Sequence, residues 1–116
     1  MARCYQAADL TLVTSKVEAF GRIAAESQAC GTPVVAFGAD AIPEVVAHEV
    51  GGLVVAPEDT GALARALRVL LMDPDRRAAC ASAGRVHVER YFDERTVADQ
   101  YIALYRQIVA ENTAHA

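Results

Sequence analysis

LTLVTSKVEAFGRIAAESQACGTPVVAF, residues 10–37, is the stretch that decides the fold. It opens with a short apolar, β-branched run at residues 10–14, which predicts a buried strand. The Ala-rich residues 21–30 predict a helix that ends at Gly31, with a proline two residues later. Residues 34–37 form a second apolar run and predict a second strand. A strand, a helix and a strand at this spacing are typical of a right-handed parallel crossover.

The same alternation continues toward the C-terminus. Residues 43–48 predict a short helical turn with a proline at its first position, and residues 52–55 predict a third strand. The rest of the chain is predicted to be helical. Three acids are predicted to cap its helices, namely Asp59, Asp73 and Asp93.

Apolar residues at helical spacing indicate which helix faces are buried. Four leucines after Asp59 are predicted to share one buried face: Leu63, Leu67, Leu70 and Leu71. Further along, Val97, Leu104 and Ile108 repeat at helical spacing. The aromatic side chains in this part are predicted to anchor packing rather than to stack on bases: Tyr91, Phe92, Tyr101 and Tyr105.

These elements predict an α/β fold with a Rossmann-like parallel sheet of three strands, followed by C-terminal helices. Three parallel strands make a poor complete sheet, because parallel strands are normally buried within a wider one. Residues 3–8 resemble the tail of an earlier helix. We therefore expect residues 1–116 to be the second half of a larger domain.

Composition narrows the function classes. The chain has 116 residues, 53% of them apolar, and a net charge of −4, which argues against nucleic-acid binding because no basic surplus neutralises phosphates. No apolar run approaches the roughly 18 residues that span a bilayer, and no secretory signal opens the chain. Three scattered cysteines without a CxxC pair favour a reducing cytoplasm over a disulfide framework.

No metal site is predicted. The three histidines stand alone, without a partner four residues away. Asp73-Pro74-Asp75 has the spacing of a metal-binding Asp-x-Asp, but the proline and the helical sequence after it favour a helix cap.

Arginines concentrate late in the chain, at positions 76, 77, 85, 90 and 95. A solvated helix face is the favoured interpretation. The alternative is a patch for an anionic acceptor molecule or for the inner leaflet of a membrane, which would give the full-length protein peripheral contact with that membrane.

The candidate site is Glu18-Ala-Phe20-Gly21-Arg22-Ile-Ala-Ala-Glu26. It places one carboxylate before a Phe-Gly loop that opens a helix, and a second carboxylate in that helix. The predicted helix starts at the carboxyl end of a parallel strand, where ligands bind in open α/β sheets. Its free N–H groups suit a diphosphate, and carboxylates accept hydrogen bonds from neighbouring sugar hydroxyls. Taken alone, two Glu residues eight apart are more readily explained as two solvated acids that flank a helix start.

The surroundings of this motif resemble glycosyltransferase family 4, whose members have the GT-B fold and a Glu-x7-Glu motif. The resemblance covers nearly the whole chain. It is carried, in order, by Ala8-Asp9, Glu18-Ala-Phe20-Gly21, Glu26, residues 29–36, Ile42-Pro43-Glu44-Val45-Val46, residues 52–54, residues 59–63, Asp73-Pro74, residues 83–85 and residues 100–105.

The resemblance implies a transferase that moves a hexosyl group from a nucleotide-diphosphate sugar to an acceptor, with retention of anomeric configuration and without a metal or other cofactor. Glu26 would bind the ribose hydroxyls. Glu18, the candidate catalytic residue, would sit against the hydroxyls of the donor sugar. Backbone amides around Phe20, Gly21 and Arg22 would line the sugar and the diphosphate, and Glu44 is not expected to be catalytic.

The sequence departs from the family at two points. Asp40-Ala41 replaces a common Gly-Gly, which removes backbone freedom and adds a negative charge near the diphosphate. The family's Arg/Lys pair and N-terminal acceptor domain have no counterpart, so we expect these residues to be inactive alone. The nucleotide (UDP, GDP or ADP) and the acceptor (a saccharide or a lipid) stay open. So do two other interpretations, a non-hydrolysing sugar-nucleotide epimerase and a non-enzymatic α/β binding module.

Overall fold

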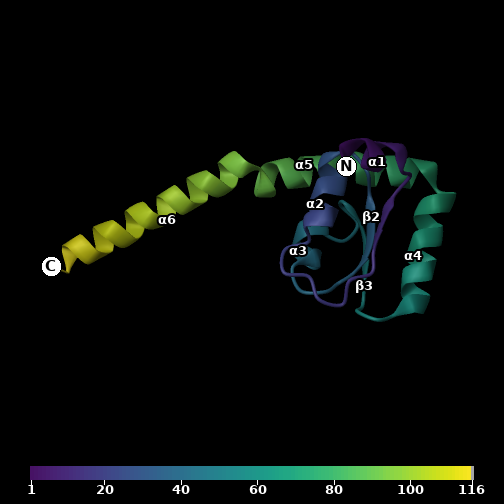
Figure 1. Cartoon of the computed structure of the whole chain (residues 1–116), viewed down its shortest axis with the longest axis horizontal. Helices are drawn as coiled ribbons and strands as arrows, with labels where there is room; N and C mark the ends of the chain where they lie inside the picture. The colour runs from purple at the N-terminus through teal and green to yellow at the C-terminus, as the bar shows by residue number, and fades with distance from the viewer. Residues whose placement is uncertain (116) are drawn as a thin grey trace.

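The computed structural model describes residues 1–115, which form an α/β body and a long C-terminal helix (Figure 1). In chain order the elements are α1 (Ala2–Ala7), β1 (Thr11–Val13), α2 (Arg22–Ala29), β2 (Val34–Phe37), α3 (Ile42–Val46), β3 (Gly52–Val55), α4 (Thr60–Met72), α5 (Pro74–Phe92) and α6 (Glu94–Ala114).

Within the described residues, three parallel strands form one sheet in the order β1-β2-β3. Thr11 pairs with Val34, and Val34 pairs with Gly52. The predicted bounds of β2 and β3 are confirmed, whereas β1 is shorter than predicted because only residues 11–13 pair with β2. The sheet therefore has β1 at one edge, where Leu12 is 46% exposed.

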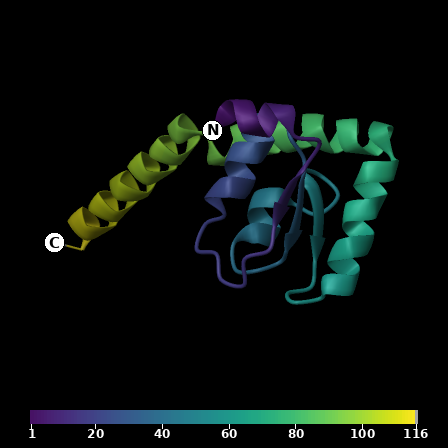
Figure 2. The same cartoon turned by 45° about the vertical axis from the view of Figure 1, so that its right-hand side comes forward.

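Helices cover both faces of the sheet, as Figure 2 shows. On one face, Val34 and Ala36 of β2 pack against α2 and α3. On the other face, Val35 and Phe37 pack against the buried side of α4. The alternation along β2 buries every one of its residues, as expected for a central parallel strand. This three-layer arrangement confirms the Rossmann-like fold.

The predicted helix caps are confirmed. Asp59 accepts a hydrogen bond from the Ala62 amide at 2.9 Å, and Asp73 accepts one from the Arg76 amide at 2.9 Å. Asp93 accepts one from the Arg95 amide at 3.1 Å. Each acid satisfies a first-turn N–H that has no partner inside its helix. The cap role of Asp73 agrees with our interpretation of the Asp-Pro-Asp stretch.

One of the four leucines predicted on the buried face of α4 lies outside it. Leu63 and Leu70 are buried, but Leu71 is 47% exposed. Leu71 follows Leu70 by about 100° around the helix, and Ala66 occupies the buried face in its place. The prediction for Leu71 was wrong because Leu70 faces the sheet, and two adjacent residues of a helix cannot both point in that direction.

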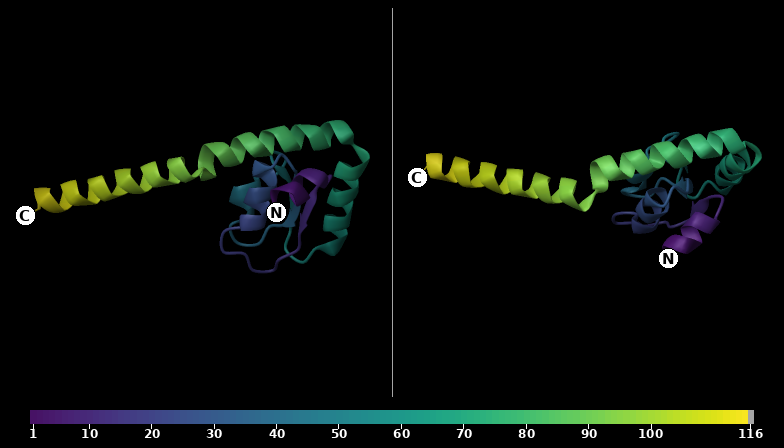
Figure 3. Two further views of the ribbon diagram at one scale, coloured as in Figure 1. Left: turned by 45° about the horizontal axis from the view of Figure 1, so that its top comes forward. Right: turned by 90° about the horizontal axis from the view of Figure 1, so that it is seen from above.

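Asp93 separates α5 from α6. The chain bends between the two helices, and α6 extends away from the body (Figure 3). Within the part of the chain that the structure describes, none of its residues is buried. Tyr101 and Tyr105 are 57% and 63% exposed, and Tyr91 at the end of α5 is 48% exposed. The prediction that these tyrosines anchor packing was therefore wrong, because among residues 1–115 each of them stays 48% to 63% exposed. Phe92 packs against the core as predicted.

Cys4, Cys30 and Cys80 are all free thiols. Across residues 1–115, no helix is both long and apolar enough to cross a membrane.

Candidate functional site

The predicted site residues lie where the strands end. The loop after β1 leads to Gly21, and the loop after β2 holds Asp40. Because the strands are parallel, their carboxyl ends meet at one edge of the sheet, and the two loops contact each other there. This edge is the place where an α/β sheet of this kind binds ligands.

Gly21 begins α2 in a conformation that favours glycine. Its φ is 89°, in the left-handed region, and a Cβ at this position would lie 2.9 Å from Cδ1 of Ile42. The Gly21 amide donates a hydrogen bond to Oε1 of Glu18 at 3.2 Å. The tight turn thus brings the first carboxylate of the motif onto the start of the helix.

The backbone of Glu18 is held by two residues of the neighbouring loop. Its amide donates to Oδ2 of Asp40 at 2.7 Å. Its carbonyl accepts a hydrogen bond from the Ala41 amide at 3.5 Å. The dipeptide that the sequence analysis noted as a departure from the family is therefore in direct contact with Glu18.

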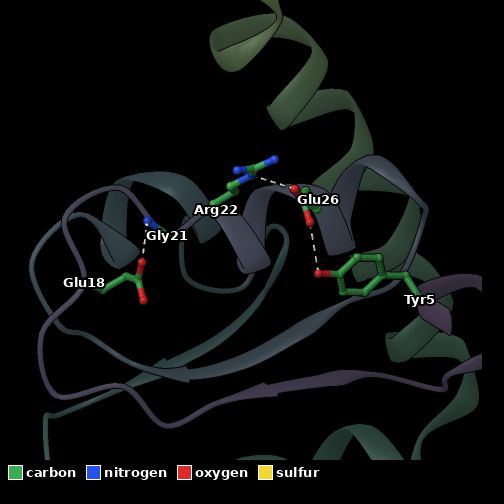
Figure 4. Close-up of polar contacts among 5 residues, drawn as sticks. All are labelled: Tyr5, Glu18, Gly21, Arg22 and Glu26. Atoms are coloured by element: carbon green, nitrogen blue, oxygen red, sulfur yellow. Dashed lines mark hydrogen bonds and ion pairs between the residues drawn. The ribbon is translucent and has the colours of Figure 1, made fainter. Parts of the chain in front are cut away.

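Glu26 lies one helical turn into α2, on the other side of Arg22 from Gly21 (Figure 4). Its Oε1 accepts a hydrogen bond from Nε of Arg22 at 2.8 Å. Its Oε2 accepts one from the Tyr5 hydroxyl at 3.2 Å. The Glu26 side chain is 37% exposed and the Arg22 side chain 85%, so solvent and ligands can reach this pair.

Tyr5 is itself fixed by the body. It is buried, and its backbone carbonyl accepts a 2.6 Å hydrogen bond from the Thr32 hydroxyl. Burial, together with the hydrogen bond to the Glu26 carboxylate, raises the pKa of Tyr5 above its ordinary value. Tyr5, Arg22 and Glu26 line a surface hollow of about 350 Å³, along with residues of α1 and the end of α2.

Phe20 packs at the opposite end of the site. Its ring lies 5.7 Å from that of Phe92 in an edge-to-face arrangement, while 44% of Phe20 stays exposed. Phe92 in turn contacts His87, whose Nε2 is 2.9 Å from the carbonyl oxygen of Glu44. Glu44 thus contributes a backbone contact that secures α5 against α3.

The site combines acidic side chains with the positive end of a helix. Glu18, Asp40 and Glu26 bring three carboxylates, and Arg22 brings one guanidinium. The amides in the first turn of α2 have no partner within the helix and can bind an anion. Over residues 1–115, no group of three or more acidic, His or Cys side chains is arranged to hold a metal ion.

The structure brings all five predicted residues to one helix and the loop before it: Glu18, Phe20, Gly21, Arg22 and Glu26. Two contacts were not predicted. Tyr5 lies 21 residues before Glu26, and the Asp40 bond to Glu18 spans 22 residues. The sequence analysis noted Asp40 as a departure from the family, and Asp tolerates the φ of 47° that it adopts, but nothing in the sequence indicated a contact with Glu18. No local signal pointed to Tyr5 either.

Comparisons with known proteins agree with this geometry. Residues 1–87 match the family model described as glycosyl transferases group 1. A D-inositol 3-phosphate glycosyltransferase of Saccharomonospora viridis is 40% identical over 95% of this chain and 25% of its own length. The chain therefore spans about a quarter of the length of the curated relatives it matches.

Solved structures share the fold of this chain. A sucrose-phosphate synthase from Thermosynechococcus elongatus superimposes with a TM-score of 0.83 and 39% identity, over 93% of this chain and 27% of the synthase. HepE from Anabaena, solved in complex with UDP-glucose, superimposes with a TM-score of 0.81 and 31% identity, over 90% of this chain and 29% of HepE.

Together, the parallel sheet and the helix-start loop define the class: the C-terminal, Rossmann-like part of a GT-B glycosyltransferase. The chain belongs to the glycosyl transferases group 1 family.

Proposed function

We propose that the protein containing this chain transfers a hexosyl group from a nucleotide-diphosphate sugar to an acceptor hydroxyl, with retention of anomeric configuration. In this proposal α2 and the loop before it form the donor site. HepE, 31% identical to this chain, has been solved with UDP, with UDP-glucose and with UDP plus glucose, which supports a nucleotide-sugar donor.

Each site residue has a role in this proposal. Glu26 accepts hydrogen bonds from the ribose hydroxyls, and Glu18 accepts them from the transferred sugar. The amides around Phe20, Gly21 and Arg22 line the sugar and the diphosphate. The helix start stabilises the departing diphosphate with backbone N–H groups, together with an Arg/Lys pair expected outside these residues, and no metal or other cofactor is needed.

One observation carries this assignment. The Glu18 carboxylate accepts a hydrogen bond from the Gly21 amide at the start of α2. The carboxylate of Glu26, eight residues after Glu18, accepts one from the Tyr5 hydroxyl. A nucleotide-diphosphate sugar has its diphosphate between two groups rich in hydroxyls. Two carboxylates flanking the N–H groups of a helix start match that distribution of charge and hydroxyls.

The acceptor is proposed from the relatives. Several relatives at 40–45% identity are named D-inositol 3-phosphate glycosyltransferases. Inositol phosphates are therefore the first acceptors to test. Other saccharides and lipid acceptors follow in the same screen.

The test is a transfer assay on the complete gene product that contains this sequence. UDP-, GDP- and ADP-hexoses are offered with each acceptor, and the product's anomeric configuration is determined by NMR. We expect transfer with retention, and none from the 116 residues alone, which span about a quarter of their relatives. Inversion of configuration would refute the mechanism, and turnover by the 116 residues would refute the need for the remainder.

A further inference from the structure

Asp40 adopts a conformation that most side chains avoid. Its φ is 47°, in the left-handed region, where Asp and Asn are the most frequent residues after glycine. Its Oδ2 accepts a hydrogen bond from the amide of Glu18, at the short distance of 2.7 Å that is typical of a charged acceptor. The next residue, Ala41, donates to the carbonyl of Glu18. Both backbone groups of Glu18 are thus bound by one dipeptide.

The segment around Glu18 has little else to hold it. Val17 is 82% exposed, Ala19 is exposed, and Phe20 is 44% exposed. Lys16 forms an ion pair with Glu58 at 2.9 Å, but both side chains are more than half exposed. Exposed pairs of this kind hold a loop weakly. Apart from the contact of Phe20 with Phe92 and the turn at Gly21, the hydrogen bonds from the neighbouring loop are what holds this segment in place.

We propose that Asp40 is a positioning residue for Glu18. Its carboxylate fixes the backbone from which the Glu18 side chain reaches the Gly21 amide, and so sets where the Glu18 carboxylate meets the transferred sugar. This inference rests on the proposed function of the site. In this proposal Asp40 acts through the backbone of Glu18.

Three substitutions separate the contributions of Asp40. Asp40→Asn keeps a side-chain acceptor and tolerates the positive φ, but removes the charge. Asp40→Gly keeps the backbone conformation and removes the acceptor. Asp40→Ala removes the acceptor and strains the backbone as well. The acceptor, the charge and the strain are thereby tested one at a time.

The experiment uses the complete gene product and compares kcat, nucleotide-diphosphate affinity and hydrogen exchange at the Glu18 amide, read by mass spectrometry. For Asp40→Gly we expect kcat to fall and the Glu18 amide to exchange faster, each by about tenfold, because one hydrogen bond to a charged group is lost. Nucleotide affinity should stay within about twofold. Asp40→Asn should keep most of the wild-type kcat and protection, and Asp40→Ala should match Asp40→Gly with a lower melting temperature.

The proposal is overturned if Asp40→Gly leaves kcat and Glu18 exchange unchanged, or if Asp40→Asn is as impaired as Asp40→Gly. It is also overturned if Asp40→Gly weakens nucleotide binding as much as it lowers kcat. A wild-type protein without transferase activity would instead refute the proposed function, and the exchange rates would still decide whether Asp40 positions Glu18.

Discussion

The two carboxylates of the site are held in different ways. Glu18 lies in an exposed loop, and its position depends on backbone contacts with a second loop and on the turn at Gly21. Glu26 lies within α2, and its carboxylate is oriented by side chains, Tyr5 from α1 and Arg22 from the same helix. One carboxylate therefore depends on loop geometry and the other on a helix and its neighbour.

This difference has a consequence for function. A helix holds Glu26 ready for a ligand, as suits a group proposed to bind the constant part of the donor, the ribose. The Glu18 loop is fixed by few hydrogen bonds, so small changes there should alter the fit to the sugar. We expect substitutions at the two ends of α2 to affect different steps.

The largest effect on stability is expected at the turn that opens α2. Gly21→Ala places a side chain at φ 89° and within 2.9 Å of Ile42, whereas Gly31→Ala meets a similar φ of 76° with nothing within 4 Å. The left-handed backbone alone costs about 1–2 kcal/mol. Urea denaturation should therefore show a loss of about 1–2 kcal/mol for Gly31→Ala and a larger loss for Gly21→Ala. Equal losses would mean that the Ile42 contact is without consequence.

A smaller effect is expected from Tyr5→Phe, which removes only the hydroxyl that binds Glu26. The ring stays, so the loss is about 1 kcal/mol for one hydrogen bond. Without this donor Glu26 is less well oriented, and calorimetry should show nucleotide-diphosphate binding weakened by about three- to tenfold. Tyr101→Phe on the exposed face of α6 is the matched control and should change neither quantity.

The pH dependence of stability provides a second measurement on Tyr5. Its pKa is raised above the ordinary value of 10.0, first by burial and then by the Glu26 carboxylate. The folded state therefore holds the phenol proton more tightly than the unfolded state does, which makes the fold more stable while Tyr5 is protonated. This contribution to the free energy of unfolding is fully present below pH 10. It is lost as the pH rises above 10 through the raised pKa. Stability in that range should fall more steeply for the wild type than for Tyr5→Phe.

The smallest effect is expected from Arg22→Ala. The Arg22 side chain is 85% exposed and its ion pair with Glu26 is of the kind worth about 0.5 kcal/mol or less. Because the proposal assigns the donor contact to the Arg22 amide, nucleotide affinity should change by less than about threefold. A loss of tenfold or more would contradict this expectation and would mean that the guanidinium contacts the ligand or is needed to orient Glu26.

Much of the body could be predicted because local signals were strong. β2 and β3 are apolar runs bounded by turn residues, and Asp59, Asp73 and Asp93 stand directly before helical patterns. The tyrosines of α6 were mispredicted because helical spacing cannot say whether another element covers a side chain. Leu71 was mispredicted for a local reason, because it is turned by about 100° from the buried Leu70.

Only the part of the candidate site that is local in sequence could be predicted. The motif from Glu18 to Glu26 is local, so its placement at the start of α2 followed from the strand and the glycine. Tyr5 and Asp40 reach it across 21 and 22 residues. Contacts of this kind depend on how loops and helices meet, which residue spacing along the chain does not encode.

The most direct test of the two roles compares Glu18→Gln with Glu26→Ala in the complete gene product, by calorimetry with nucleotide diphosphate and by steady-state kinetics. Glu26→Ala should weaken nucleotide binding by about tenfold or more, because each lost bond to a charged group is worth roughly 1.5–3 kcal/mol. Glu18→Gln should leave that affinity within about twofold and lower turnover, because the free nucleotide lacks the sugar that Glu18 contacts. Equal weakening of nucleotide binding by both substitutions, or no effect of either on binding or rate, would contradict the assignment.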